Sequence, residues 1–151
     1  MLSYAARAVS PAPCQELWSL LLDAASWPSW SAVDELLLDE SEGLAPDGRD
    51  GVGATRAFRT GKVVMIERIT ALEPPRRFAY EGVRSAFISD YAAVIELDET
   101  SSGGTVIRWS GSYTARRGTG WLMRRIMRGV MQRMADGLAS SSSAPTSPPH
   151  G

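Results

Sequence analysis

Five strand-like segments, joined by tight turns, constrain the fold of this chain more than any other feature. They span residues 52–59, 63–72, 77–83, 91–97 and 105–114. Turn-forming residues separate them, among them Gly61-Lys62 and Pro74-Pro75. Successive short strands with such links are typical of an antiparallel meander, which we therefore predict for the centre of the chain.

A long amphipathic helix is predicted directly after the last strand, over residues 121–139. Its apolar side chains share one broad face, while most of its polar side chains lie on the other. The apolar face comprises Leu122, Met123, Ile126, Met127, Val130, Met131, Met134 and Leu138. A face of this kind has to cover another surface of the protein.

The residues before the meander predict two more strands with helical segments between them. A strand over 2–9 is followed by a helix that Ser10 can cap and that ends near Ala25. Trp27-Pro28-Ser29-Trp30 fits a short helical turn, and residues 33–39 fit a strand. The sheet would then have about seven strands.

The composition favours one globular domain. The chain has 151 residues, of which 44% are hydrophobic and 22% charged, which suits one core rather than two. We expect a single domain over residues 1–139 and a disordered Ser/Pro-rich tail over 140–151. Cys14 is the only cysteine, and neither a signal-peptide pattern nor a membrane-spanning apolar run is present. A cytoplasmic protein without stable membrane insertion is therefore expected.

A series of landmark segments extends over roughly residues 2–138. It consists of Ser10-Pro11-Ala12-Pro13 leading into 16–23, Trp27-Pro28-Ser29-Trp30, Gly51-Val52-Gly53, 69–80 and 103–109. In order and spacing these segments together resemble the START-related ligand-binding superfamily (SRPBCC), most closely its polyketide cyclase/dehydrase-like branch.

The resemblance implies an α+β helix-grip fold. In this fold a curved antiparallel sheet of about seven strands wraps around a long C-terminal helix, and two short helices lie between strands 1 and 2. It also implies a cavity between helix and sheet as the ligand site. Functions in the family range from ligand carriage to aromatase, cyclase and hydrolase-like reactions, so the fold alone does not fix the function.

The methionines of the long helix are candidate ligand contacts. Flexible, polarizable thioether side chains can form a cavity wall that adapts to apolar ligands, or can simply fill the core. The residues concerned are Met123, Met127, Met131 and Met134.

Aromatic residues supply further candidates. Trp30 is expected near the cavity mouth, where an indole offers apolar area and an N–H donor, whereas Trp27 is expected to be structural. Alternation on the last strand puts Ile107, Trp109 and Tyr113 on the face toward the helix, where Trp109 can equally fill the core. The ligand contacts predicted outside the helix are therefore Trp30, Phe78, Tyr91, Ile107, Trp109 and Tyr113.

Glu67 and Tyr80 are the candidate catalytic residues. Glu67 has the same strand parity as Met65, so it can point inward, where desolvation would raise its pKa and suit it to general acid or base catalysis. The opposite face, with Ile66, is an equally plausible inner face and would leave Glu67 in solvent. Tyr80 and Arg59 are weaker candidates for polar contacts in a pocket.

Several kinds of chemistry are not indicated. His150, the only histidine, lies in the predicted tail, so neither a Ser-His-Asp triad nor a histidine metal site is expected. Gly51-Val52-Gly53 lacks the third glycine and the βαβ context of a dinucleotide site. We expect no metal and no cofactor.

Arginines make the long helix and the residues before it basic. They are Arg116, Arg117, Arg124, Arg125, Arg128 and Arg133. A basic amphipathic helix can suit an anionic membrane or a nucleic acid, but its apolar face is needed to complete the core. We expect these arginines to pair with the acidic residues between 34 and 42, and we expect no nucleic-acid partner.

Three functions remain open, and the least favoured is a protein-interaction module that acts through the basic helix, with binding that weakens as salt rises. The implied cavity and the missing catalytic constellation favour binding or carriage of a small hydrophobic or amphipathic molecule. The alternative is a polyketide cyclase-, aromatase- or dehydratase-like enzyme acting on a ligand held in that cavity. In either case the expected partner is a small hydrophobic molecule, and the expected state is a monomer or homodimer.

Overall fold

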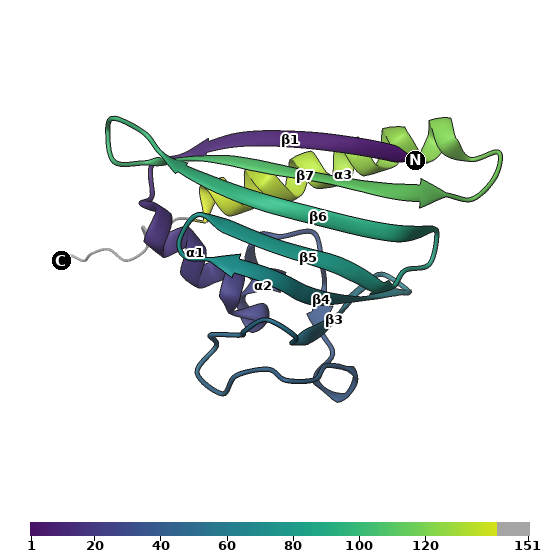
Figure 1. Cartoon of the computed structure of the whole chain (residues 1–151), viewed down its shortest axis with the longest axis horizontal. Helices are drawn as coiled ribbons and strands as arrows, with labels where there is room; N and C mark the ends of the chain where they lie inside the picture. Colours follow the sequence, from purple (N-terminus) through teal and green to yellow (C-terminus); the bar gives the residue numbers. More distant parts are fainter. Residues whose placement is uncertain (142–151) are drawn as a thin grey trace.

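Seven antiparallel strands form one curved sheet in the computed structural model, which describes residues 1–141 (Figure 1). They are β1 (Leu2–Ser10), β2 (Glu35–Leu36), β3 (Thr55–Thr60), β4 (Val63–Glu73), β5 (Arg77–Arg84), β6 (Ile88–Glu99) and β7 (Thr105–Ala115). Their order across the sheet is β1-β7-β6-β5-β4-β3-β2. Every link from β2 to β7 therefore joins neighbouring strands, and only the connection from β1 to β2 crosses the sheet.

The helices lie on one face and at one end of this sheet. They are α1 (Cys14–Leu22), α2 (Trp27–Trp30) and α3 (Gly120–Ser140), with 3-10 turns η1 (Ala24–Ser26) and η2 (Leu38–Glu40). α3 packs chiefly against β1 and β7, and α1 and α2 close the end at which α3 finishes (Figure 1). The predicted α+β helix-grip fold is confirmed.

Strand alternation builds the face that α3 covers. In β1, Ala6 and Ala8 are buried between exposed neighbours, and in β7 the side chains of Ile107 and Trp109 are fully buried. Because the β1 alanines are small, the helix backbone can approach that strand closely. α3 therefore lies over the β1–β7 side of the sheet.

Three predicted boundaries are wrong. The strand predicted over 33–39 is reduced to β2, because the chain turns into η2, where the Ser41 hydroxyl donates to the Leu37 carbonyl at 2.7 Å. β3 begins only at Thr55, since Gly53 has a φ of 96°, outside the strand region. α1 ends at Leu22 rather than near residue 25, and Ser10 does not cap it because Ser10 still belongs to β1.

The C-terminal helix extends one residue into the predicted tail. α3 ends at Ser140 and Ser141 follows it as the C-cap, whereas residues 142–151 of that tail, with His150, lie outside the described residues. Within residues 1–141, no helix has the length and apolar character needed to cross a membrane.

Candidate functional site

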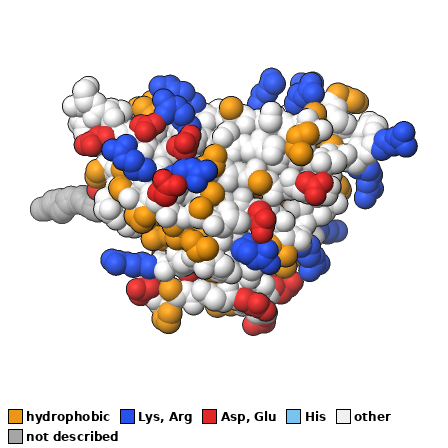
Figure 2. Space-filling view, viewed as in Figure 1, with side chains coloured by type: hydrophobic (Ala, Val, Ile, Leu, Met, Phe, Trp, Pro, Cys, Tyr) orange, Lys and Arg blue, Asp and Glu red, His pale blue; other side chains and the backbone are white. Residues whose placement is uncertain are grey.

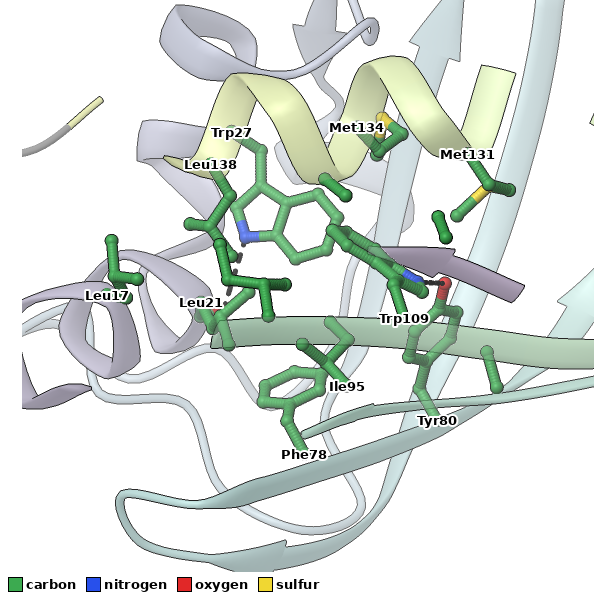
Figure 3. Packing of buried hydrophobic residues seen from close by; sticks show 14 of the residues in the cluster. Leu17, Leu21, Trp27, Phe78, Tyr80, Ile95, Trp109, Met131, Met134 and Leu138 are labelled. Carbon is green, nitrogen blue, oxygen red and sulfur yellow. Dashed lines mark hydrogen bonds between the residues drawn. The ribbon is translucent and has the colours of Figure 1, made fainter. Parts of the chain in front are cut away.

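A cavity of about 220 Å³ lies between α3 and strands β3 to β6. Because α3 packs against β1 and β7, its opposite flank stands away from this half of the sheet. The apolar walls are Met127, Val130, Met131 and Met134 of α3, with Trp27, Ala32, Val33, Phe58 and Met65. The polar lining consists of Thr60, Glu67, Tyr80, Tyr91 and Arg133. Figure 3 shows Met131 and Met134 on the helix, with Tyr80 on the sheet below them.

Glu67 lies on the inner face of β4. The register between β3 and β4 places Glu67 opposite Arg56 and Met65 opposite Phe58. Met65, Glu67 and Phe58 line the cavity, whereas Ile66 does not. Of the two faces that the sequence left open, the structure turns the Glu67 face inward.

The carboxyl group of Glu67 is poorly solvated. Burial raises the pKa of Glu67 to about 7, and the nearby positive charge of Arg56 opposes part of this rise. No hydrogen bond from the described residues stabilises the carboxylate, and the side chain keeps some accessible surface where it lines the cavity. Near neutral pH this group exists in both protonation states, as a general acid or base requires.

Arg56 is a buried cation beside the cavity. Its side chain is only 2% exposed, and its Nη2 donates to the Leu21 carbonyl oxygen at 2.7 Å. Its Nε lies 3.7 Å from Asp50 Oδ2. Three aromatic rings surround the guanidinium carbon at 4.8 to 5.7 Å, those of Trp27, Phe58 and Phe78. Burial lowers the pKa of Arg56 to about 10, against the opposing charge of Asp50, so the group remains protonated at neutral pH.

Three tyrosine hydroxyls form a buried chain on the sheet side of the cavity. Trp109 Nε1 donates to the Tyr80 hydroxyl at 3.1 Å, and the Tyr80 and Tyr91 hydroxyls lie 3.0 Å apart. The Tyr91 hydroxyl also pairs with that of Tyr4. Burial raises the pKa of each tyrosine above its ordinary value, so all three stay neutral and can donate or accept a hydrogen bond.

The family of the chain follows from a match along nearly its whole length. The family model described as polyketide cyclase / dehydrase and lipid transport matches residues 1–142. The chain belongs to this family. The resemblance inferred from the landmark segments is therefore confirmed, and no curated protein matches the sequence significantly.

Solved structures similar to this polyketide cyclase/dehydrase family member share its fold at low sequence identity. A START superfamily protein from Mycobacterium smegmatis is 11% identical, with a TM-score of 0.77, over 95% of this chain and 99% of that one. The protein XoxI from Bacillus cereus is 18% identical, with a TM-score of 0.75, over 93% and 95% of the two chains. Aha1 from Colwellia psychrerythraea, described as a dimer, is 14% identical, with a TM-score of 0.65, over 95% and 100%.

The structure of this family member brings several predicted site residues together. Met127, Met131, Met134, Glu67, Tyr80 and Tyr91 all line the cavity. These residues come from α3, β4, β5 and β6, so the fold gathers them from distant parts of the sequence. Their roles in binding or catalysis stay predictions.

Trp30 does not line the cavity, and Trp27 does. Trp30 packs against the rings of Trp27 and Trp109 and donates from Nε1 to the Ser26 hydroxyl at 3.1 Å. Both indoles are buried, and Trp27 also stacks on the ring of Phe58, a residue of the cavity lining. Trp27 therefore lies at the cavity and Trp30 does not, which is the opposite of the positions expected from the sequence.

Other predicted contacts also lie outside the cavity lining. They are Phe78, Ile107, Trp109, Tyr113 and Met123. Alternation puts Ile107 and Trp109 on the correct face, but both are fully buried in the core, where Trp109 packs against Trp27 and Trp30 of α2. Met123 borders a separate hollow with Phe87. Arg59 is directed outward and forms an ion pair with Glu35 at 2.9 Å, because its strand parity is opposite to that of Phe58.

Arg56, Asp50 and Tyr4 belong to the site region without having been predicted. A signal for Arg56 exists in the sequence, since a two-residue turn at Gly61-Lys62 pairs Thr60 with Val63 and thereby Arg56 with Glu67. No local pattern reveals that Asp50, in the preceding loop, reaches back to Arg56. Among residues 1–141, no three His, Cys, Asp or Glu side chains are grouped closely enough to hold a metal ion.

Proposed function

We propose that this protein binds a small hydrophobic or amphipathic molecule in the cavity between α3 and the sheet. The observation that carries the proposal is the composition of the cavity, whose methionine and aromatic walls enclose a few polar groups on one side. Ligand sites have this composition because apolar walls supply affinity and a small number of polar groups fix orientation. Membership of a family described by polyketide cyclase / dehydrase and lipid transport supports it.

The size of the cavity limits the ligand. Its volume of about 220 Å³ is below the roughly 300–1,000 Å³ of sites for drug-sized molecules. A compact molecule, or one end of a longer one, matches this space. The methionines can change rotamer and enlarge it, which suits a wall that accepts more than one apolar shape.

The polar lining predicts where a ligand would place its oxygen or nitrogen atoms. Tyr80, Tyr91 and Glu67 all line the cavity. An amphipathic ligand would direct its hydroxyl, carbonyl or amine group toward these three side chains. Its apolar part would then lie along Met127, Met131 and Met134 of α3.

A thermal-shift screen with fatty acids, sterols and aromatic polyketides tests this proposal. Binding to the native state alone raises stability by mass action, by about 2.7 kcal/mol at a ligand concentration a hundred times the dissociation constant. For a domain of this size that corresponds to a rise in Tm of roughly 5–10 °C. The absence of stabilisation by every apolar compound would count against binding in the cavity.

Enzymatic activity of the cyclase, aromatase or dehydratase type is a second candidate. One observation favours it: Glu67, with a pKa of about 7, lies in an apolar cavity that Tyr80 also lines. A carboxyl group of this kind can move a proton to or from a bound carbonyl compound. Turnover of a polyketide substrate should fall in Glu67→Gln while ligand binding persists, and unchanged turnover would remove Glu67 from this role.

Residues 1–139 would act as one ligand-binding domain, in the cytoplasm, as a monomer or homodimer. The expected partner remains a small hydrophobic molecule, without nucleic acid, metal or cofactor. Size-exclusion chromatography with light scattering checks the oligomeric state.

A further inference from the structure

A patch of large apolar side chains is exposed at the N-terminal part of α3 and the β5–β6 hairpin. It consists of Phe87, Trp121, Leu122 and Ile126, whose exposed fractions range from 42% to 71%. Phe87, Leu122 and Ile126 border one hollow of about 230 Å³ on the surface. We call these four residues the α3 patch. Exposed apolar clusters of this kind mark interaction surfaces.

Arginines without acidic partners among residues 1–141 lie close to the α3 patch in the sequence, and Arg116 borders its hollow. They are Arg116, Arg117, Arg124, Arg125 and Arg128. Within residues 1–141, ion pairs involve other arginines, such as Arg59 and Arg68, and none of these five. The pairing that the sequence predicted with acidic residues 34–42 is therefore wrong for this cluster. Figure 2 shows basic side chains (blue) at the end of the molecule where β7 leads into α3.

The same helix leads from the α3 patch to the cavity. Leu122, Ile126 and Val130 follow one another at intervals of four residues, so they form one strip along α3. Val130 and its neighbour Met127 line the cavity. An apolar path on the surface therefore joins the patch to the lining of the cavity.

We propose that the α3 patch docks on an anionic membrane surface. While docked, the protein takes up the ligand of the cavity from the membrane or delivers it there. The docking follows from the patch and its charge, and only the ligand exchange rests on the proposed function. Apolar side chains enter the boundary between headgroups and acyl chains, Trp121 suits the interface, and arginines reach the phosphates. A two-fold dimer through this patch is disfavoured, because the arginines of the two copies would face each other.

Vesicle binding tests the docking. The full chain is mixed with vesicles of phosphatidylcholine alone, or of equal parts phosphatidylcholine and phosphatidylglycerol, and bound protein is measured by co-sedimentation. Binding is expected only with phosphatidylglycerol and should weaken as salt rises, because the attraction is electrostatic. Equal binding to both vesicles, or binding to neither, would overturn the proposal.

Trp121 provides a local probe of the contact. It is the exposed tryptophan, at 71%, whereas Trp18, Trp27, Trp30 and Trp109 are each exposed by 6% or less. Lipids brominated in the acyl chain should therefore quench the fluorescence of the wild type on binding, and should quench Trp121→Phe much less. Equal quenching of both proteins would place the membrane contact elsewhere and refute the assignment of the α3 patch.

Matched variants separate the contributions of charge and of apolar area to vesicle binding. Arg124→Gln, Arg125→Gln and Arg128→Gln together should weaken partitioning to anionic vesicles roughly a hundredfold. Leu122→Ser with Ile126→Ser should weaken it roughly tenfold. The controls are Leu38→Ser, an exposed leucine on η2, and a triple Gln variant of the ion-paired Arg76, Arg77 and Arg108. Controls that lose as much binding as the patch variants would contradict the proposal.

Vesicle binding and the ligand thermal shift test the docking and the cavity independently. None of the substituted residues of the α3 patch lines the cavity, so these variants should keep the thermal shift produced by any ligand. A protein that binds vesicles but no ligand would refute the cavity alone. A protein that binds ligand but no vesicles would refute the docking alone.

Discussion

Replacing Glu67 by Gln should change how the stability of the protein depends on pH. The pKa of Glu67 rises from an ordinary 4.5 to about 7 in the folded protein, mainly through desolvation. Between these values the folded state holds a proton that the unfolded state has released, so the free energy of unfolding falls as pH rises. At 1.36 kcal/mol per pKa unit, the free energy of unfolding would fall by about 3 kcal/mol in total. Access of water to Glu67 through the cavity reduces this fall to about 2–3 kcal/mol.

Urea unfolding of both proteins across pH 4 to 8 measures this effect. Glu67→Gln lacks the titrating group. Its free energy of unfolding relative to the wild type should therefore increase as pH rises from about 4.5 to about 7, and the difference should stay constant above that pH. The matched control is Glu81→Gln, which removes a carboxylate on the outer face of neighbouring β5, in an ion pair with Arg68. Its effect should stay below about 1 kcal/mol. A wild type and a Glu67→Gln variant with parallel pH profiles would refute the desolvated environment of Glu67.

Three further substitutions probe the surroundings of the cavity. Asp50→Ala leaves the buried charge of Arg56 without its acidic partner and should cost about 3–5 kcal/mol in urea unfolding, whereas a loss below about 1 kcal/mol would show that the pair is dispensable. Tyr91→Phe removes the middle hydroxyl of the tyrosine chain and should cost about 1–3 kcal/mol, and an unchanged midpoint would contradict that chain. Gly137→Ala places a Cβ against the Trp30 carbonyl oxygen, so it should lower Tm despite the better helix propensity of alanine, and a higher Tm would refute this close contact of α2 and α3.

The sequence predicts the architecture because the architecture depends on periodic patterns. The strands from 63 to 114 and the helix over 121–139 repeat apolar residues at the intervals of their own secondary structure, and the observed elements match them within a few residues. β2 is the weakest of these predictions. Its run of apolar residues ends in a turn that a hydrogen bond from Ser41 closes, and no periodicity announces that turn.

The position of the cavity is less predictable because it depends on side-chain volumes in several elements at once. Alternation correctly directs Trp109 inward, but only the position of α2 decides that the indoles of Trp27 and Trp30 cover Trp109, whereas Tyr80 lines the cavity. Likewise, the small Ala6 and Ala8 draw α3 toward β1 and leave the gap on the opposite side. The methionines at 127, 131 and 134 are found from the sequence because they share a helix face, whereas Asp50 is found only from the fold.

The gap between α3 and strands β3 to β6 is the proposed site of an apolar ligand. Titration with the uncharged fluorescent probe N-phenyl-1-naphthylamine tests it most directly, using the wild type, Met127→Trp to fill the cavity, and Leu122→Trp as a control on the exposed face of the same helix. The wild type and Leu122→Trp should bind the probe saturably with similar affinity, and Met127→Trp should bind it roughly tenfold more weakly or not at all. Binding that Met127→Trp leaves unchanged, or no saturable binding by the wild type, would contradict the claim.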